Sequence, residues 1–174
     1  MKDTTFKIDS DKKDRWIIQT ERREKRIFPE TSEDNSDEFW SRIPGTGGGL
    51  NSTAYDLTIF GNCILNKGTL NGVRILGRKA VEKMTTMAIH NIPDYCWGAN
   101  TPSRGYGVGF DMRQGSAFTF SKGTYNHEGS GASALYIDPV EELVAAWFVP
   151  WVNPDEWHAE ALWNVINIIW SGIK

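Results

Sequence analysis

The hydrophobic pattern is clearest in the last third of the chain, where two strand-length runs flank a short polar turn. The runs cover residues 131–137 and 143–149, and the turn is built on Asp138, Pro139 and Glu141. The second run is apolar at every position, which is typical of a strand that is buried on both faces of a sheet. The pattern therefore predicts a hairpin whose second strand lies in the centre of a sheet.

Two helical patterns precede this hairpin. Thr53-Ala54-Tyr55-Asp56 fits a capping box with Ser52 or Thr53 as the N-cap. One buried helix face then follows with the helical period, formed by Leu57, Phe60, Gly61, Ile64 and Leu65. Gly68 is expected to end this helix. Asn71-Gly72 then predicts a tight hairpin turn between residues 69–70 and 73–76.

The second helix is expected at about residues 78–87, with Ala80, Val81 and Met84 on its buried face. Further along, residues 105–112 and 117–122 are predicted as two strands around Gln114-Gly115. In the first of them every second residue is a glycine: Gly105, Gly107 and Gly109 alternate with Tyr106, Val108 and Phe110. The glycine face is expected to lie against a helix or a ligand, and packing is the better explanation.

A last helix is predicted after Asn153, which caps it, with Pro154 in the first turn and Glu156 completing a capping box. Its wide apolar stripe must lie on a sheet, and consists of Trp157, Ala161, Leu162, Val165, Ile166, Ile169 and Trp170. The sum is an α+β domain: an antiparallel sheet covered by a C-terminal helix, with the helical pair of 53–87 on one side. We expect a single domain over residues 1–174. Residues 1–44 form an irregular lead-in, 45–104 the helical pair and loops, and 105–174 the sheet and terminal helix.

Composition narrows the function classes. A net charge of -3 gives no electrostatic case for nucleic acid or an anionic membrane. No apolar stretch is long enough to span a membrane, and the first residues lack a signal-peptide core, which carries little weight if Met1 is not the natural start. Cys63 and Cys96 are interpreted as buried thiols, with one disulfide as the alternative. The compartment therefore stays open.

Candidate chemistry is sparse. The three histidines, His90, His127 and His158, lack metal-ligand spacing, so no metal or other cofactor is predicted. The glycine-rich segment 44–50 lacks the Lys-Ser/Thr of a phosphate loop, and we interpret its glycines as a close approach to other backbone. The tetrad His127-Glu128-Gly129-Ser130 places an imidazole and a glycine just before the hairpin. These residues are either part of a functional site or ordinary turn residues at the start of a strand.

Six short motifs occur in a fixed order along the chain. They are Gly-Gly-Gly-Leu-x-Ser-Thr-Ala-x-Asp at 47–56, Gly-Thr-Leu-Asn-Gly-Val-Arg-Ile-Leu at 68–76, Lys-Ala-Val-Glu-Lys-Met-Thr at 79–85, Gly-Tyr-Gly-Val-Gly-Phe at 105–110, His-Glu-Gly at 127–129 and Tyr-Ile-Asp-Pro at 136–139. In this order and spacing the chain resembles the C-terminal part of the serine β-lactamase-related family, which includes class C β-lactamases, D-alanyl-D-alanine carboxypeptidases and related esterases. The resemblance implies part of a β-lactamase/transpeptidase-like fold.

The resemblance also implies site residues. The family uses Ser-x-x-Lys for the nucleophile, Tyr-x-Asn for proton transfer, and Lys-Thr-Gly or His-x-Gly on a strand that faces the serine. By this resemblance His127 faces the substrate, Gly129 leaves room for it, and the Ser130 backbone N–H is an oxyanion-hole donor. Glu128 stands where the family often has threonine, and its charge would repel a substrate carboxylate. This favours esters or uncharged amides over β-lactams and D-Ala-D-Ala peptides.

The other two family elements are not recognisable. Ser10-Asp11-Lys12-Lys13 matches Ser-x-x-Lys formally but sits among charges, so we interpret it as a coincidence, and no Tyr-x-Asn occurs. The chain is therefore expected to be the C-terminal portion of a serine hydrolase for a small-molecule or peptide substrate, inactive on its own. The alternative is a non-catalytic binding or interaction domain with the same fold. In the family the final strand has a partner from the N-terminus of the enzyme, so we expect residues 143–149 to self-associate through their edge.

Overall fold

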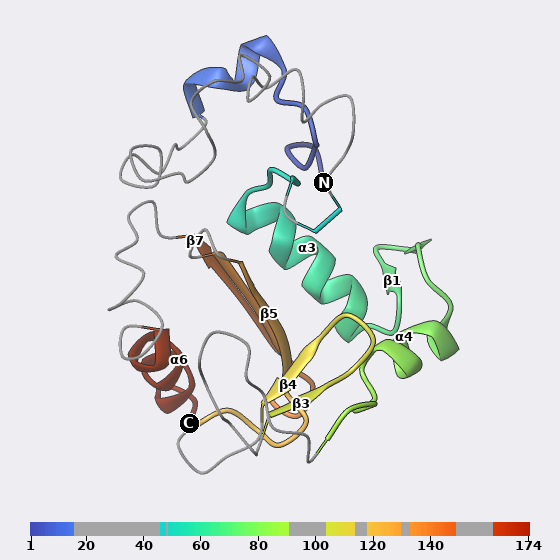
Figure 1. Ribbon diagram of the computed structural model, residues 1–174, viewed down its shortest axis with the longest axis vertical. Helices are drawn as coiled ribbons and strands as arrows, with labels where there is room; N and C mark the ends of the chain where they lie inside the picture. Colours follow the sequence, from blue (N-terminus) through green and yellow to red (C-terminus); the bar gives the residue numbers. More distant parts are fainter. Residues whose placement is uncertain (16–45, 48, 91–103, 114–117, 130–132, 149–161) are drawn as a thin grey trace, which may run out of the picture.

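The computed structural model describes residues 1–15, 46–47, 49–90, 104–113, 118–129, 133–148 and 162–174 (Figure 1). Its elements are, in chain order, the 3-10 helix η1 (Ser10–Arg15), α3 (Ala54–Leu65), β1 (Thr69–Leu70), β2 (Val73–Arg74), α4 (Arg78–Met84), β3 (Arg104–Tyr106), β4 (Asp111–Arg113), β5 (Tyr125–Gly129), β6 (Ser133–Asp138), β7 (Leu143–Phe148) and α6 (Leu162–Ser171).

Five of these strands form one antiparallel sheet in the order β3-β4-β5-β6-β7. Helices α3 and α6 lie on opposite sides of its strands (Figure 1). Residues along β6 alternate between the two sides: Leu135 and Ile137 pack with Ile64 of α3, whereas Tyr136 packs with Ile166 of α6. The predicted α+β class, an antiparallel sheet covered by the C-terminal helix, is therefore confirmed.

Helix α3 begins and ends where the sequence predicts. The Thr53 hydroxyl accepts a hydrogen bond from the Asp56 backbone N–H at 3.1 Å, which satisfies one of the free donors of the first turn. At the other end, Gly68 has a φ of +89° and its N–H donates to the Cys63 carbonyl at 2.8 Å. Gly61 and Ile64 are buried on the predicted face. Cys63 is a buried free thiol, while Cys96 lies outside the described residues.

The hairpin β1–β2 has its predicted turn, because Asn71 and Gly72 both adopt positive φ, at 49° and 79°. Helix α4 is shorter than predicted and stops at Met84. Val81 is buried as expected, but Ala80 is exposed, because a helix of seven residues turns only a narrow face to the core. The prediction of a buried Ala80 is wrong.

The predicted strand 105–112 is two strands, β3 and β4, joined by a turn at Gly109, which has a φ of +100°. The described residues of the predicted strand 117–122, which begin at 118, pair with no other strand. Instead, the Thr119 N–H donates to Asn167 of α6 at 3.0 Å. The first prediction failed because the alternation was taken as one strand where Gly109 allows a reversal.

Glycines in β3 and just after it do lie against packed chain, as expected. A Cβ atom at Gly105 would be 2.6 Å from the Met87 side chain, and one at Gly107 would be 2.5 Å from the Met84 carbonyl oxygen. Gly47 does not show such an approach, because a Cβ atom there would meet no described atom within 4 Å.

Within the described residues, strand β7 lies at the edge of the sheet and not in the predicted central position. Its apolar run is explained by the two helices instead: Val144 and Ala146 pack on the α3 side, whereas Ala145 and Trp147 pack on the α6 side. Both faces of this strand pack against a helix, but in the described part of the chain only one of its edges is paired. Strand β7 is half-buried, whereas β6 is buried almost throughout.

Helix α6 covers its side of the sheet with the predicted stripe, in which Ile166 and Trp170 are buried. The Trp170 indole N–H donates to Asp138 at 2.8 Å, and so ties the helix to the end of β6. The predicted cap at Asn153, Pro154 and Glu156 lies outside the described residues.

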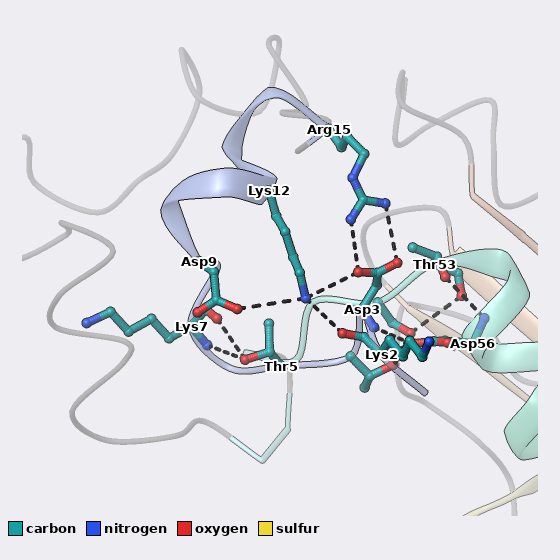
Figure 2. A network of polar contacts seen from close by, with 11 residues as sticks. Lys2, Asp3, Thr5, Lys7, Asp9, Lys12, Arg15, Thr53 and Asp56 are labelled. Atoms are coloured by element: carbon teal, nitrogen blue, oxygen red, sulfur yellow. Dashed lines mark hydrogen bonds and ion pairs between the residues drawn. The ribbon is translucent and has the colours of Figure 1, made fainter.

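Residues 1–15 attach to the start of α3 (Figure 2). Thr5 pairs with Asn51 in an isolated antiparallel bridge. The Asp56 carboxylate accepts hydrogen bonds from the Asp3 N–H and the Thr4 hydroxyl, both at 2.8 Å. Burial acts to raise the pKa of the Asp56 carboxyl, but these bonds outweigh it and lower the pKa below its ordinary value. No helix in the described part of the chain is long and apolar enough to cross a membrane.

Candidate functional site

Strand β5 carries His127, Glu128 and Gly129. Its sequence, Tyr-Asn-His-Glu-Gly, lacks a hydrophobic alternation, and the strand forms because it pairs over all five residues with β6. The register sets His127 opposite Leu135 and Gly129 opposite Ser133. The predicted tetrad is thus mostly a strand rather than a turn, and the resemblance anticipated this where the hydrophobic pattern did not.

Alternation along β5 separates the predicted site residues. Directly opposite residues of antiparallel strands share a face, so His127 and Gly129 lie on the α3 side of the sheet with Leu135. Glu128 lies on the α6 side, where its carboxylate accepts a hydrogen bond from the buried Tyr136 hydroxyl. The structure therefore brings His127 and Gly129 together and turns the Glu128 carboxylate away from them.

His127 is exposed although its neighbours Tyr125 and Asn126 are buried. Its ring makes an edge contact with Tyr106 of β3, with centroids 6.3 Å apart and planes at 87°. Burial raises the pKa of Tyr125 to about 12, so that its phenol is neutral near pH 7. The imidazole of His127 is therefore the accessible titratable group on this side of β5.

Within the described residues, one edge of β5 has no strand partner beside His127. Strand β4 pairs with β5 only at Asp111 and Asn126. Beyond that point, no strand within the described residues lies beside residues 127–129 on the side away from β6. Backbone N–H and C=O groups at an open edge can pair with an extended ligand. The arrangement offers an imidazole and a free strand edge next to each other.

Gly129 has a structural requirement of its own. A Cβ atom at this position would lie 2.3 Å from the hydroxyl oxygen of Ser133 on β6. Any larger residue would therefore displace the Ser133 side chain. That Gly129 leaves room for a substrate stays a prediction. Ser133, which packs against Gly129, was not identified from the sequence. The strand register would have identified Ser133, but the sequence pattern does not give that register.

The other predicted residues lie outside the described part of the chain or away from β5. Ser130 lies outside the described residues. Ser10 and Lys13 are both exposed on η1, which lies apart from the sheet in Figure 1. Within the described residues, no group of three His, Cys, Asp or Glu side chains could hold a metal ion.

The β-lactamase family model matches residues 1–167 of the chain. The fold is similar to that of a β-lactamase from Mycobacterium bovis, with a TM-score of 0.54 and 23% identity over 70% of this chain and 44% of that one. It is also similar to a penicillin-binding protein homolog from Caulobacter crescentus, with a TM-score of 0.51 and 19% identity over 59% of this chain and 28% of that one. The chain thus spans less than half of either structure. No curated protein matches the sequence.

Proposed function

Because the chain belongs to the β-lactamase family, we propose that it forms the C-terminal portion of a serine hydrolase that cleaves an amide or ester. In this proposal a serine outside the portion seen here attacks the substrate carbonyl and forms an acyl-serine intermediate, which water then hydrolyses. The observation that carries the proposal is the exposed His127 beside the open edge of β5.

Each predicted residue has a role in this proposal. His127 donates a hydrogen bond to the substrate, or bears a positive charge beside it, from the α3 side of the sheet. The backbone N–H of Ser130 donates to the oxyanion of the tetrahedral intermediate. The backbone of His127 pairs with the main chain of a peptide or amide substrate, which is supported by the end of β4 pairing at Asn126 within the described residues.

The expected preference for neutral substrates depends on Glu128. Its carboxylate lies on the α6 side and is bonded by Tyr136, on the opposite face from His127. Glu128 should therefore repel a substrate carboxylate beside His127 less strongly than its adjacent position in the sequence suggests. The backbone of β5 lies between the Glu128 carboxylate and the substrate. The preference for esters or uncharged amides stays a prediction. A cephalosporin hydrolysed much faster than a neutral short-chain ester would contradict it.

The placement of Ser10 favours a second candidate, a non-catalytic binding or interaction domain. The Ser-x-x-Lys match at Ser10 is exposed on a short 3-10 helix and has no buried lysine beside it. A nucleophile needs an adjacent base or a desolvated lysine, and neither is supplied at Ser10. This chain by itself would then bind a ligand along β5 without reacting with it.

Labelling distinguishes the two candidates. The chain is incubated with a fluorophosphonate or a fluorescent β-lactam, and its intact mass is measured. We expect no covalent adduct on residues 1–174 alone, and an adduct mapped to Ser10 would reverse our interpretation of that motif. The gene upstream of Met1 is read as well, and an open frame encoding Ser-x-x-Lys and Tyr-x-Asn would support the hydrolase.

If that longer protein exists, His127→Ala should lower its kcat/KM by about 10²–10³-fold, the range for the loss of one hydrogen-bond donor that acts on the transition state. His90→Ala is the matched control, because His90 is also exposed but lies outside β5. An equal loss in both variants would argue against a specific role for His127. Labelling of the longer protein without any effect of His127→Ala would retain the hydrolase and reject this residue.

A further inference from the structure

Tyr136 on β6 is a buried phenol whose ring is packed among other aromatic side chains. It is 0% exposed. It stacks on Trp147 with ring centroids 5.4 Å apart. Trp170 makes an edge contact with it at 6.0 Å, and Phe120 makes a tilted contact at 6.1 Å. A ring that is enclosed in this way keeps one orientation, so the Tyr136 hydroxyl is a donor with a fixed position on the α6 side of the sheet.

This hydroxyl donates a hydrogen bond to the Glu128 carboxylate on the neighbouring strand β5. The register sets Tyr136 opposite Asn126, so Glu128 is the diagonal neighbour of Tyr136 on the same face, within reach of a tyrosine side chain. A hydroxyl that donates to a carboxylate forms a bond about twice as strong as a bond between neutral groups. The pair therefore holds the Glu128 side chain on the α6 side.

Glu128 lies between His127 and Gly129, which are on the opposite side of the strand. Because the three residues share one stretch of backbone, a rotation of β5 about its own axis would move Glu128 and His127 together. A fixed Glu128 side chain resists that rotation at the residue next to the imidazole. The hydrogen bond is on the face away from His127, so it can act on the site without contact to a substrate.

We propose that Glu128 and Tyr136 are positioning residues, which hold β5 so that the His127 imidazole faces the substrate. This inference rests on the proposed function of His127. The role depends on an acceptor at position 128 and a donor at position 136. Glutamine keeps an acceptor oxygen and should preserve most of the effect, whereas alanine at 128 or phenylalanine at 136 should abolish it.

NMR spectroscopy of the chain tests the positioning without any activity. The His127 ring makes a perpendicular contact with Tyr106, so the ring current of Tyr106 makes the imidazole proton shifts of His127 a measure of its position. Tyr136→Phe should change these shifts. It should also raise amide hydrogen exchange at residues 127–129 by about tenfold, the order of magnitude for the loss of a hydrogen bond to a charged group.

Two further variants make the test specific. Glu128→Gln should leave both NMR measurements close to those of the unmodified chain. Tyr125→Phe is the matched control, because it also removes a tyrosine hydroxyl from this part of the sheet, but on the α3 side, where burial and not a hydrogen bond raises the pKa of Tyr125. It should not raise exchange at residues 127–129.

A double-mutant cycle separates the pair from general packing. In the Glu128→Ala background, Tyr136→Phe should have little further effect, because the hydrogen bond is already lost. Additive effects of the two substitutions would overturn the proposal. So would unchanged exchange at residues 127–129 in Tyr136→Phe, or an equal rise at residues 143–148 of β7, which would indicate a loss of stability throughout the sheet.

Kinetics of the longer protein separate this inference from the proposed function. With a neutral ester as substrate, Tyr136→Phe should lower kcat by about tenfold with little change in KM, because a displaced group weakens binding of the transition state. Glu128→Gln should restore most of the kcat that Glu128→Ala loses. An unchanged kcat in Tyr136→Phe would reject the positioning role and retain the hydrolase. Absence of covalent labelling in the longer protein would reject the hydrolase, and the NMR measurements would still decide whether the pair holds His127.

Discussion

The two faces of the sheet are held by different interactions. On the α3 side the core is mainly aliphatic, with Ile64 against Leu135 and Ile137. On the α6 side it is aromatic and polar: Tyr136 stacks on Trp147 with ring centroids 5.4 Å apart, and Trp170 makes an edge contact with Tyr136 and donates to Asp138. The α3 face is therefore held by close packing of side chains, whereas the α6 face is held by packing and by directed hydrogen bonds.

The difference lies in how each helix approaches the strands. Gly61 lets α3 come so close that a Cβ atom there would be 2.5 Å from Val144. Helix α6 is instead held through Asp138, whose carboxylate also accepts from the backbone N–H groups of Ser121 and Val140 at 2.9 and 3.0 Å. The α3 side should thus respond to added volume, and the α6 side to the loss of an acceptor.

Asp138→Ala should have the largest effect. Burial acts to raise the pKa of Asp138, but its hydrogen bonds outweigh this and lower the pKa. Removal of the carboxylate leaves several donors without an acceptor, including the Trp170 indole, at about 3–5 kcal/mol of unfolding free energy. Urea denaturation measures it. A loss below 1 kcal/mol would show that the α6 face does not depend on this acceptor.

Gly61→Ala should have the next largest effect, on the α3 side. The new methyl group would also contact Leu135 at 3.1 Å, and the overpacking should exceed the gain in helix propensity, with a net loss of about 1–3 kcal/mol. Thermal denaturation measures it. Gly72→Ala is a control with ample space but a strained positive φ, so it separates backbone strain from overpacking. Unchanged stability in Gly61→Ala would mean that the two layers can separate at little cost.

Asn126→Leu should change stability in the opposite direction. Asn126 is buried on the α6 face, and neither its amide oxygen nor its nitrogen has a hydrogen-bond partner in the described structure. An apolar side chain of similar size removes that penalty and should raise the unfolding free energy by about 1 kcal/mol. Asn62→Leu is the control, because the Asn62 amide donates to the Thr58 carbonyl at 2.8 Å and should gain nothing. Destabilisation by Asn126→Leu would show that the amide is satisfied in solution.

Asp56→Asn should have the smallest effect, and one that depends on pH. The folded pKa of Asp56 is lowered, so the carboxylate stabilises the fold above its ordinary pKa of 3.8 and loses this contribution as the pH falls through the folded pKa. The difference in unfolding free energy between the two proteins should therefore be largest near pH 7 and shrink below about pH 4. Denaturation curves from pH 3 to 7 measure it. A difference that is constant with pH would contradict a role for the charge.

Sequence predicted the elements whose signals are local. The capping box at Thr53, the glycine stop at Gly68 and the turn at Asn71-Gly72 each fix a few backbone angles through their own side chains, and all three are confirmed. The order of the motifs also predicted the family.

Features that depend on distant partners were not predictable in the same way. Strand β5 has no hydrophobic period and forms by pairing with β6. The apolar run of β7 correctly indicated that both faces pack against other parts of the chain, although the strand is only half-buried. The run carried no information about whether both edges are paired. For the candidate site, the resemblance identified His127, but the direction in which Glu128 points required the strand register.

The contact between Gly61 and Val144 has a consequence for how the sequence can change over time. The two residues occupy one shared volume between α3 and β7, so a methyl group can be added at position 61 if the γ-methyl groups of Val144 are removed. The double variant Gly61→Ala/Val144→Ala should recover part of the stability lost in Gly61→Ala. In diverging lineages these two positions should then be substituted as a pair. A larger residue at position 61 should occur together with a smaller one at position 144.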